Sequence, residues 1–282
     1  MSLDPDHLMS YEIPSVTQSY SEKDSALYAL SLGVGQDPLD KSELQFAGGA
    51  GPVVAFPSMP VVLGHPGFWL GRPDTGVDPV QVVHGEQSID IYKPIASSGT
   101  VTGTTRVTGL VDKGPDKGAL LYTEKELVDE DGEIFAKTHR TTFIRGAGGF
   151  GKSTVEEKSV PKPPETEPDI VVESATRPEQ ALYYRWNGDD NPLHVDPDVA
   201  KKAGFHRPIL HGLCTYGIAA RLIVHSMLKD NPSSLRHLSG RFTSPVFPGN
   251  RLRAFIWKSG YFRILNDSNG RIVMDNGTFS ST

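Results

Sequence analysis

The sequence predicts an α+β protein made of two related halves. Each half begins with a helix signal and continues as a run of antiparallel strands, and a proline-rich segment separates the two. The 282 residues suffice for one large domain or for two. With 37% hydrophobic and 22% charged residues, the chain can form a packed core.

A linker divides the chain near its middle. Residues 158–169 contain four prolines and alternate in charge, a composition that is stiff, extended and unable to pack. We therefore expect an N-terminal half at 1–157, the linker at 158–169 and a C-terminal half at 170–282.

Helices are predicted from capping residues and from apolar spacing. Ser21 and Asp24 stand at a helix start in the first half, and Thr176 with Pro178 does so in the second. The strongest signal covers 210–228, where apolar or small residues recur every three or four positions, as in a buried stripe. This stripe consists of Leu210, Leu213, Gly217, Ala220, Ile223 and Met227.

Strands are predicted after each helical region. The turns between them carry Asp131-Gly132, Ser259-Gly260 and Asn269-Gly270, which are typical of hairpins. The strands cover 87–92, 99–110, 119–128 and 133–144 in the first half, and 237–245, 251–258, 261–266 and 271–279 in the second.

A weak echo between the halves indicates a duplication. Ala26-Leu27-Tyr28 recurs as Ala181-Leu182-Tyr183, and Gly33 then corresponds to Gly188. The two halves thus share a pattern as well as an order of elements.

Charge and composition exclude several classes of protein. A net charge of -6 and a pI of 5.8 make the chain a poor nucleic-acid binder, and any anionic ligand must be held by local cations. The single cysteine, Cys214, excludes an internal disulfide. No secretory signal stands at the start, and the longest apolar stretch, 53–63, is too short to cross a membrane. The last residues, 280–282, do not form a peroxisomal tripeptide.

The richest polar stretch lies between two predicted helices. Asp189, Asn191 and His194 stand within six residues on a tight connection, so all three can point into one pocket. A carboxylate and an imidazole together can move a proton between water and carbon, an effect typically worth about 10²–10⁴ in rate. In the echo between the halves, Asp189 corresponds to Val34 and His194 to Leu39, so the first half lacks these polar groups. The same residues also suit a polar turn without a catalytic role.

A second candidate feature stands at the start of the long helix. Gly212 lies where N–H groups are unpaired and the helix dipole is positive. Glycine lets a ligand approach the backbone closely, and an N–H aimed at a carbonyl oxygen is typically worth about 10²–10³ in rate. The alternatives are that Gly212 is only a helix-packing contact and that His211 is a surface residue.

Three motifs carry a resemblance. They are Gly188-Asp189-x-Asn191-Pro192-Leu193-His194, then Ala203-Gly204-Phe205, then Pro208-Ile209-Leu210-His211-Gly212-Leu213-Cys214-Thr215. Together they resemble the MaoC-like hydratase 2 family, which includes the hydratase part of peroxisomal multifunctional enzymes. The likeness covers nearly the whole chain and includes segments 30–35, 84–87, 112–114, 145–150 and 246–249.

The resemblance implies a double hot-dog fold, in which two antiparallel sheets each wrap around a long helix. It implies reversible, R-specific hydration of trans-2-enoyl-CoA in fatty-acid metabolism. No metal or cofactor is expected, because coenzyme A enters as part of the substrate. It also implies a homodimer, in peroxisomes if the source is eukaryotic and otherwise in the cytoplasm.

By the same resemblance, Asp189 and His194 are the catalytic pair, with Asn191 beside them, and Gly212 is the oxyanion-hole glycine. A degenerate first half suggests that its helix has given way to the fatty tail. The expected acyl-CoA contacts are His84, Gly85, Lys113, Asp190, Pro192, Leu193, Arg241 and Phe242. Lys113, Arg241, Arg251 and Arg253 are candidates for binding the CoA phosphates, and each can instead be an ordinary surface charge.

Two departures from the family pattern stand out. Trp186-Asn187 replaces the usual Leu-Ser before the motif glycine. Ala47-Gly48-Gly49 stands where some relatives carry a glutamate near Phe46, which leaves a third catalytic acid in doubt.

Three other readings compete with hydration. Residues 146–153 fit the phosphate-loop pattern, but no apolar helix follows them, so nucleotide hydrolysis is disfavoured. A non-catalytic acyl-CoA-binding protein is disfavoured by the presence of Asp189 and His194. A thioesterase stays open, because hot-dog folds host several thioester reactions.

Overall fold

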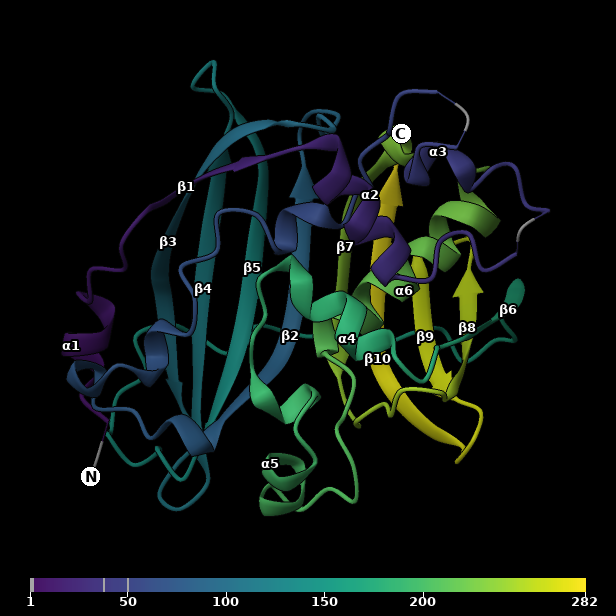
Figure 1. The fold of residues 1–282 in the computed structure, drawn as a ribbon. Helices are drawn as coiled ribbons and strands as arrows, with labels where there is room; N and C mark the ends of the chain where they lie inside the picture. Colours follow the sequence, from purple (N-terminus) through teal and green to yellow (C-terminus); the bar gives the residue numbers. More distant parts are fainter. Residues whose placement is uncertain (1–2, 38, 50) are drawn as a thin grey trace.

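Ten antiparallel strands form one continuous sheet, and the helices gather on one side of it (Figure 1). The computed structural model describes residues 3–37, 39–49 and 51–282. The strand order is β1-β3-β4-β5-β2-β7-β10-β9-β8-β6. The strands are β1 (Val16–Tyr20), β2 (Val82–Ile91), β3 (Gly99–Asp112), β4 (Gly118–Val128), β5 (Ile134–Arg145), β6 (Ile170–Ala175), β7 (Leu235–Phe242), β8 (Arg251–Trp257), β9 (Tyr261–Asn266) and β10 (Arg271–Ser281).

The helices are short except for one. The longest, α6, has 16 residues, and of the helices in the described ranges none is long and apolar enough to cross a membrane. The α-helices are α1 (Pro5–Met9), α2 (Glu22–Ser31), α3 (Leu44–Ala47), α4 (Gln180–Tyr184), α5 (Pro197–Lys202) and α6 (Gly212–Met227). The 3₁₀ turns are η1 (Met59–Val61), η2 (Trp69–Gly71), η3 (Pro73–Thr75), η4 (Pro79–Gln81), η5 (Arg185–Asn187), η6 (Pro192–His194) and η7 (Pro232–Ser234).

The strand order repeats in mirror image about the β2–β7 pair. Reading outward from that pair, each half runs through its fifth, fourth and third strands to its first. Gly33 and Gly188, which correspond in sequence, both take left-handed backbone angles, φ 91° and 98°, after a helical segment. The common order and the matched glycines support the expected duplication.

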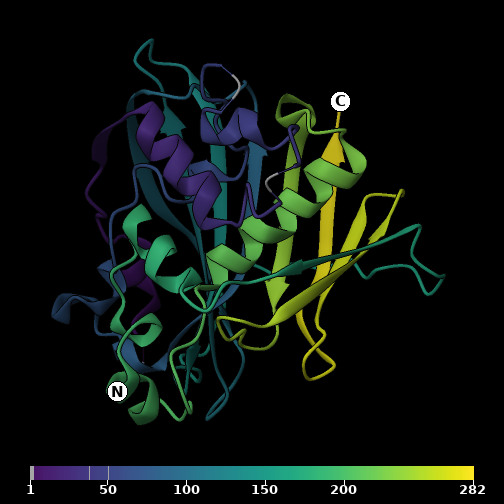
Figure 2. The ribbon, with the colours of Figure 1, turned by 45° about the vertical axis from the view of Figure 1, so that its right-hand side comes forward.

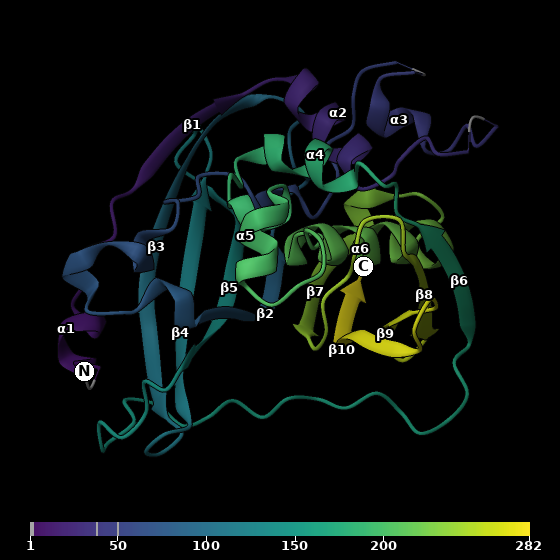
Figure 3. The same ribbon diagram turned by 60° about the horizontal axis from the view of Figure 1, so that its bottom comes forward.

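The second-half sheet curves around α6, as seen from below (Figure 3) and from the side (Figure 2). The predicted stripe at 210–228 is confirmed, although α6 begins two residues later, at Gly212. The helix is buried on nearly all sides, because the first half packs on the face that the sheet leaves free. At Gly217 an added Cβ would lie 2.4 Å from Leu32 Cδ2. Leu32 is the C-cap of α2, so this glycine lets the C-terminal end of α2 pack closely on α6.

Among the first-half residues that the structure describes, no helix is comparable to α6. Between β1 and β2, the described residues form α2, the single turn α3 and four 3₁₀ turns. Residues of this loop segment, among them Val61, Phe68 and Trp69, line a pocket over the inner face of β4 and β5. Irregular chain thus takes the place that α6 has in the second half, while the expectation that a fatty tail occupies this space stays a prediction.

Some predicted elements differ from the structure. Strands β1 and β6 are absent from the prediction, because each is a short edge strand whose sequence does not alternate cleanly between apolar and polar residues. Helix α4 begins at Gln180, later than expected, because the Thr176 hydroxyl donates to the Asn250 carbonyl at 2.8 Å instead of capping a helix. The capping box of Ser21 and Asp24 at α2 is confirmed.

The glycine-rich segment 146–153 forms a loop, as expected, and opens no helix. The Asp112 carboxylate accepts the N–H groups of Gly149 and Gly151, both at 2.7 Å, so a protein carboxylate satisfies donors that a phosphate loop would offer to its ligand. From there to β6 the chain runs across the molecule without helix or strand (Figure 3).

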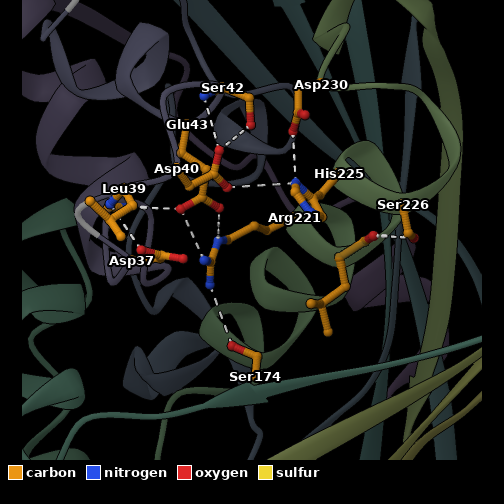
Figure 4. Close-up of polar contacts among 12 residues, drawn as sticks. Asp37, Leu39, Asp40, Ser42, Glu43, Ser174, Arg221, His225, Ser226 and Asp230 are labelled. Carbon is orange, nitrogen blue, oxygen red and sulfur yellow. Dashed lines mark hydrogen bonds and ion pairs between the residues drawn. The ribbon is translucent and has the colours of Figure 1, made fainter.

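A buried ion pair fixes α6 against the first half (Figure 4). Arg221 Nε and Nη2 lie 2.5 and 3.0 Å from the two carboxylate oxygens of Glu43. Glu43 also accepts the Gly35 N–H at 2.8 Å, and Arg221 Nη1 reaches the Ser174 hydroxyl at 3.4 Å. The Glu43 side chain is only 4% exposed. One contact thus joins the loop after α2, the edge strand β6 and the central helix.

Replacing Glu43 by glutamine should destabilise the protein by roughly 3 kcal/mol, because it leaves the Arg221 charge buried without its partner. Urea unfolding followed by circular dichroism measures the change. Glu165→Gln, in the exposed linker, serves as the control. The paired change Glu43→Leu with Arg221→Met should cost less than Glu43→Gln alone. A loss for Glu43→Gln as small as that of the control would contradict this role.

Candidate active site

Two 3₁₀ turns position the carboxylate and the imidazole predicted to act together. Turn η5 ends at Gly188, whose φ of 98° reverses the chain before Asp189. Turn η6 begins after Asn191, has Pro192 at its first position, and ends at His194. The connection is short and fixed at both ends, so the Asp189 and His194 side chains lie on one side of it.

A single hydrogen bond orients the His194 ring. His194 Nδ1 lies 2.9 Å from the carbonyl oxygen of Ile209. A carbonyl can only accept, so Nδ1 carries the hydrogen and donates it, which leaves Nε2 of the neutral ring as the free acceptor. Burial lowers the pKa of His194, while the bond to Ile209 and the charge of Asp189 oppose that shift. The ring is therefore neutral at pH 7 and able to accept a proton.

His211 completes the group from the other side. Its ring stacks on that of His194 with centroids 3.8 Å apart and an interplanar angle of 30°. Its Nε2 lies 3.3 Å from the backbone carbonyl of Asp189. Burial, and then the nearby His194, lower the pKa of His211 to about 4. At 1% exposure it is a buried residue, so the alternative that it lies on the surface is wrong.

Asp189, His194 and His211 converge. One carboxylate oxygen of Asp189 and one ring nitrogen of each histidine all lie within 4.8 Å of one another. This spacing allows a water molecule to contact both the Asp189 carboxylate and His194 Nε2. A carboxylate with two imidazoles is also a set that can ligate a metal ion such as zinc. The expectation that no metal takes part stays a prediction.

Gly212 places unpaired backbone donors beside this group. It is the first residue of α6, and His211 is the helix N-cap. Within the described ranges, the N–H groups of Gly212 and Leu213 have no backbone or side-chain acceptor. They point out of the helix N-terminus, where the dipole favours negative charge. An added Cβ at Gly212 would lie 3.4 Å from the Phe242 ring, which shows how closely the walls approach here.

His84, Gly85 and Phe242 lie at the junction of the two halves. The rings of His84 and Phe242 meet edge to face, with centroids 4.9 Å apart. Gly85 lies at a register shift between β2 and β5, where a Cβ would come 3.2 Å from the Thr141 carbonyl. Phe242 also faces Gly212. These three expected substrate contacts thus gather near the start of α6.

The residues between Asp189 and His194 make contacts of their own or face solvent. The Asn191 side-chain oxygen accepts the Leu193 N–H at 3.1 Å and so caps η6. Asp190 is exposed and lies 3.6 Å from Arg185. Pro192 is exposed and Leu193 partly so. Their part in substrate binding, and that of Asn191 in catalysis, stay predictions.

The four candidate cations do not gather in one place. Lys113 pairs with Glu157 at 2.5 Å, and Arg251 and Arg253 pair with Glu173 on the edge strand β6. Arg241 lies opposite Glu86 on β2 and points to the outer face, since it precedes the inward Phe242. The structure therefore does not bring Arg241, Arg251 or Arg253 together with the acid–base group.

The expectation about a third acid has a structural counterpart. Ala47, Gly48 and Gly49 carry no carboxylate, and Gly48, with a left-handed φ of 77°, ends α3. The buried acid nearest in sequence is Glu43, and Arg221 holds both its oxygens. Glu43 is thus a structural acid.

Arg140 was not among the site residues expected from the sequence. It lies on β5 between Thr138 and Thr142, lines the pocket of the first half, and is influenced by the charge of Asp189. The alternation Thr-x-Arg-x-Thr is a signal that a charged residue faces inward, but the outer-face residues of the strand alternate just as regularly.

Comparisons with known proteins agree with this arrangement. The MaoC like domain matches residues 157–276, and the MFE-2 hydratase 2 N-terminal domain matches residues 18–146. "Enoyl-CoA hydratase 2, peroxisomal" of Arabidopsis thaliana is 40% identical over 271 residues, which cover 90% of this chain and 87% of that protein.

Solved structures confirm the fold. A MaoC-like dehydratase from Phytophthora capsici has a TM-score of 0.86 and 34% identity, and the match covers 98% of both chains. A Mycobacterium tuberculosis protein described as a double hotdog fold has a TM-score of 0.57 at 16% identity, covering 100% of this chain and 96% of that one. The expected double hot-dog fold is confirmed, and the chain belongs to the hydratase 2 family of MaoC-like proteins.

Proposed function

We propose that this chain hydrates trans-2-enoyl-CoA thioesters to (R)-3-hydroxyacyl-CoA, and that Asp189 and His194 activate the water. The observation that carries the proposal is the convergence of the Asp189 carboxylate and His194 on one point, beside the unpaired N–H of Gly212. Relatives named as enoyl-CoA hydratase 2 support the substrate class.

The reaction balances with these groups alone. The water oxygen bonds to C3 of the enoyl thioester while the acid–base pair accepts one of its protons. The electrons of the double bond shift toward the thioester oxygen, which the Gly212 N–H stabilises. A proton then passes from the pair to C2, which restores the carbonyl and leaves the pair unchanged. Water adds across the double bond, and the reverse sequence is dehydration.

The setting follows from the relatives. We propose a peroxisomal location if the source is eukaryotic and a cytoplasmic one otherwise, because relatives carry peroxisomal names. A homodimer, and activity without metal or cofactor, stay predictions.

Incubation with a chelator should leave the rate of hydration unchanged, because the proposed mechanism uses no metal ion. A loss of activity that a divalent cation restores would contradict the metal-free mechanism.

Asp189→Asn and His194→Gln should each lower kcat/KM for trans-2-decenoyl-CoA by about 10²–10⁴, because each removes one of the groups that move the proton. Loss of absorbance of the conjugated thioester measures the rate, and chiral chromatography identifies the product. Asp198→Asn, an exposed acid on α5, serves as the control.

Wild-type activity in Asp189→Asn would contradict the assigned role. Release of free CoA without a hydroxyacyl product would instead identify a thioesterase.

The pH dependence should follow the buried imidazole. Burial lowers the pKa of His194, so its basic form persists below pH 6.5, the ordinary value. We expect kcat/KM to stay level from pH 8 to 6.5 and to fall only at lower pH, as His194 takes up a proton. A stopped-flow pH series measures this limb. An acid limb centred above pH 6.5 would contradict a depressed pKa at the catalytic base.

A further inference from the structure

The pocket over the first half of the sheet has two unlike sides: polar side chains from the strands face apolar side chains from the covering loop. It lies on the inner face that α6 covers in the second half, and Leu213, next to Gly212, forms part of its wall. The pocket therefore reaches the first turn of α6, beside the proposed oxyanion-hole glycine. Its strand residues are Gln87, Thr105, Thr123, Lys125, Thr138, Arg140 and Thr142, whereas its loop side carries Val61, Phe68, Trp69 and Leu70.

Two basic residues, Lys125 and Arg140, line this pocket, and they differ in their contacts. Lys125 is 5% exposed, and its ammonium donates to the backbone carbonyls of Pro60, Val61 and Leu63. All three of its donors are thus used to hold the covering loop. Lys125 is a structural residue of the pocket wall.

Arg140 has no such partners. Within residues 3–37, 39–49 and 51–282, its guanidinium makes neither a hydrogen bond nor an ion pair, and its Nε is closed to solvent and unpartnered. Asp189 acts on it electrostatically but lies beyond ion-pair distance. Arg140 is partly buried, and a guanidinium stays charged at any physiological pH, so its enclosure without a partner is unfavourable. Arg140 is therefore a ready site for an anion that enters with a ligand.

The electrostatic environment of Arg140 also favours an anion. The charges of Arg140 and Lys125 both act on His65 at the pocket wall, and that of Arg140 also acts on His84. Burial lowers the pKa of Lys125 to about 7, so Arg140 is the group that keeps this pocket positive in a chain of net charge -6. The neighbouring threonine hydroxyls and the Gln87 amide can donate to the same ligand.

We propose that the acyl pocket of this chain takes an enoyl chain that carries a carboxylate at its far end, and that Arg140 binds this carboxylate. The inference rests on the proposed hydratase function and names its preferred substrate class: CoA monothioesters of unsaturated dicarboxylic acids. A guanidinium matches a carboxylate with two parallel hydrogen bonds, which gives selectivity as well as affinity.

The test compares pairs of trans-2-enoyl-CoA substrates of six, eight and ten carbons, with and without a terminal carboxylate. We expect kcat/KM to favour the carboxylate in at least one pair by roughly tenfold or more. Arg140→Met should abolish that preference, because it lowers kcat/KM more for the carboxylate-bearing member of each pair than for its unsubstituted partner. Arg140→Lys should keep part of it.

Lys137→Met is the matched control, since Lys137 is a cation on the same strand whose side chain pairs with Glu126 on the other face. It should leave the preference intact. Binding of adipoyl-CoA and hexanoyl-CoA, measured by calorimetry on wild type and Arg140→Met, gives the same comparison without turnover.

The failures are distinguishable. Hydration of the unsubstituted series with no carboxylate preference at any length overturns the inference and leaves the proposed function standing. An equal loss for all substrates in Arg140→Met overturns it too, because Arg140 would then act through Asp189. An equal preference for a terminal hydroxyl excludes selection by charge. Absence of R-specific hydration in both series overturns the proposed function, and the inference with it.

Discussion

The pairing of β2 with β7 is the contact on which the rest of the structure depends. It runs from Glu86 opposite Arg241 to Asp90 opposite His237, and it joins the two halves into one sheet. Because the halves meet edge to edge, α6 is enclosed by the second-half sheet and by first-half residues together. The end of the seam carries Phe242 against Gly212, so the same pairing sets the distance between the helix N-terminus and the opposite wall.

The two halves differ in what covers the inner face of the sheet. The second half keeps the long helix, and the turn before it carries Asp189 and His194. In the first half, loops replace the helix, and the inner face of β4 and β5 is left available to a ligand. In the function proposed above, catalysis and recognition of the acyl chain occupy equivalent faces of a duplicated unit. The Glu43–Arg221 pair holds the two in register through a charge contact that neither half could form alone.

Much of this could be read from the sequence. The stripe of α6, most strands and the Asp189–His194 pair depend on local spacing, which a sequence displays directly. Edge strands were missed, because burial of a single face leaves polar residues such as those of β1. The face on which Arg241 lies depends on register, and a shift of one residue reverses it. His211 and Arg140 required the fold itself, because their burial comes from segments far away in the chain.

We propose that an acid–base pair on one turn activates a single water opposite a helix N-terminus. A crystal structure with (R)-3-hydroxydecanoyl-CoA bound would reveal whether the product lies between these groups. We expect the 3-hydroxyl to contact both the Asp189 carboxylate and His194 Nε2, and the thioester oxygen to accept the Gly212 N–H. A product whose hydroxyl lies away from both side chains, or whose thioester turns away from α6, would contradict it.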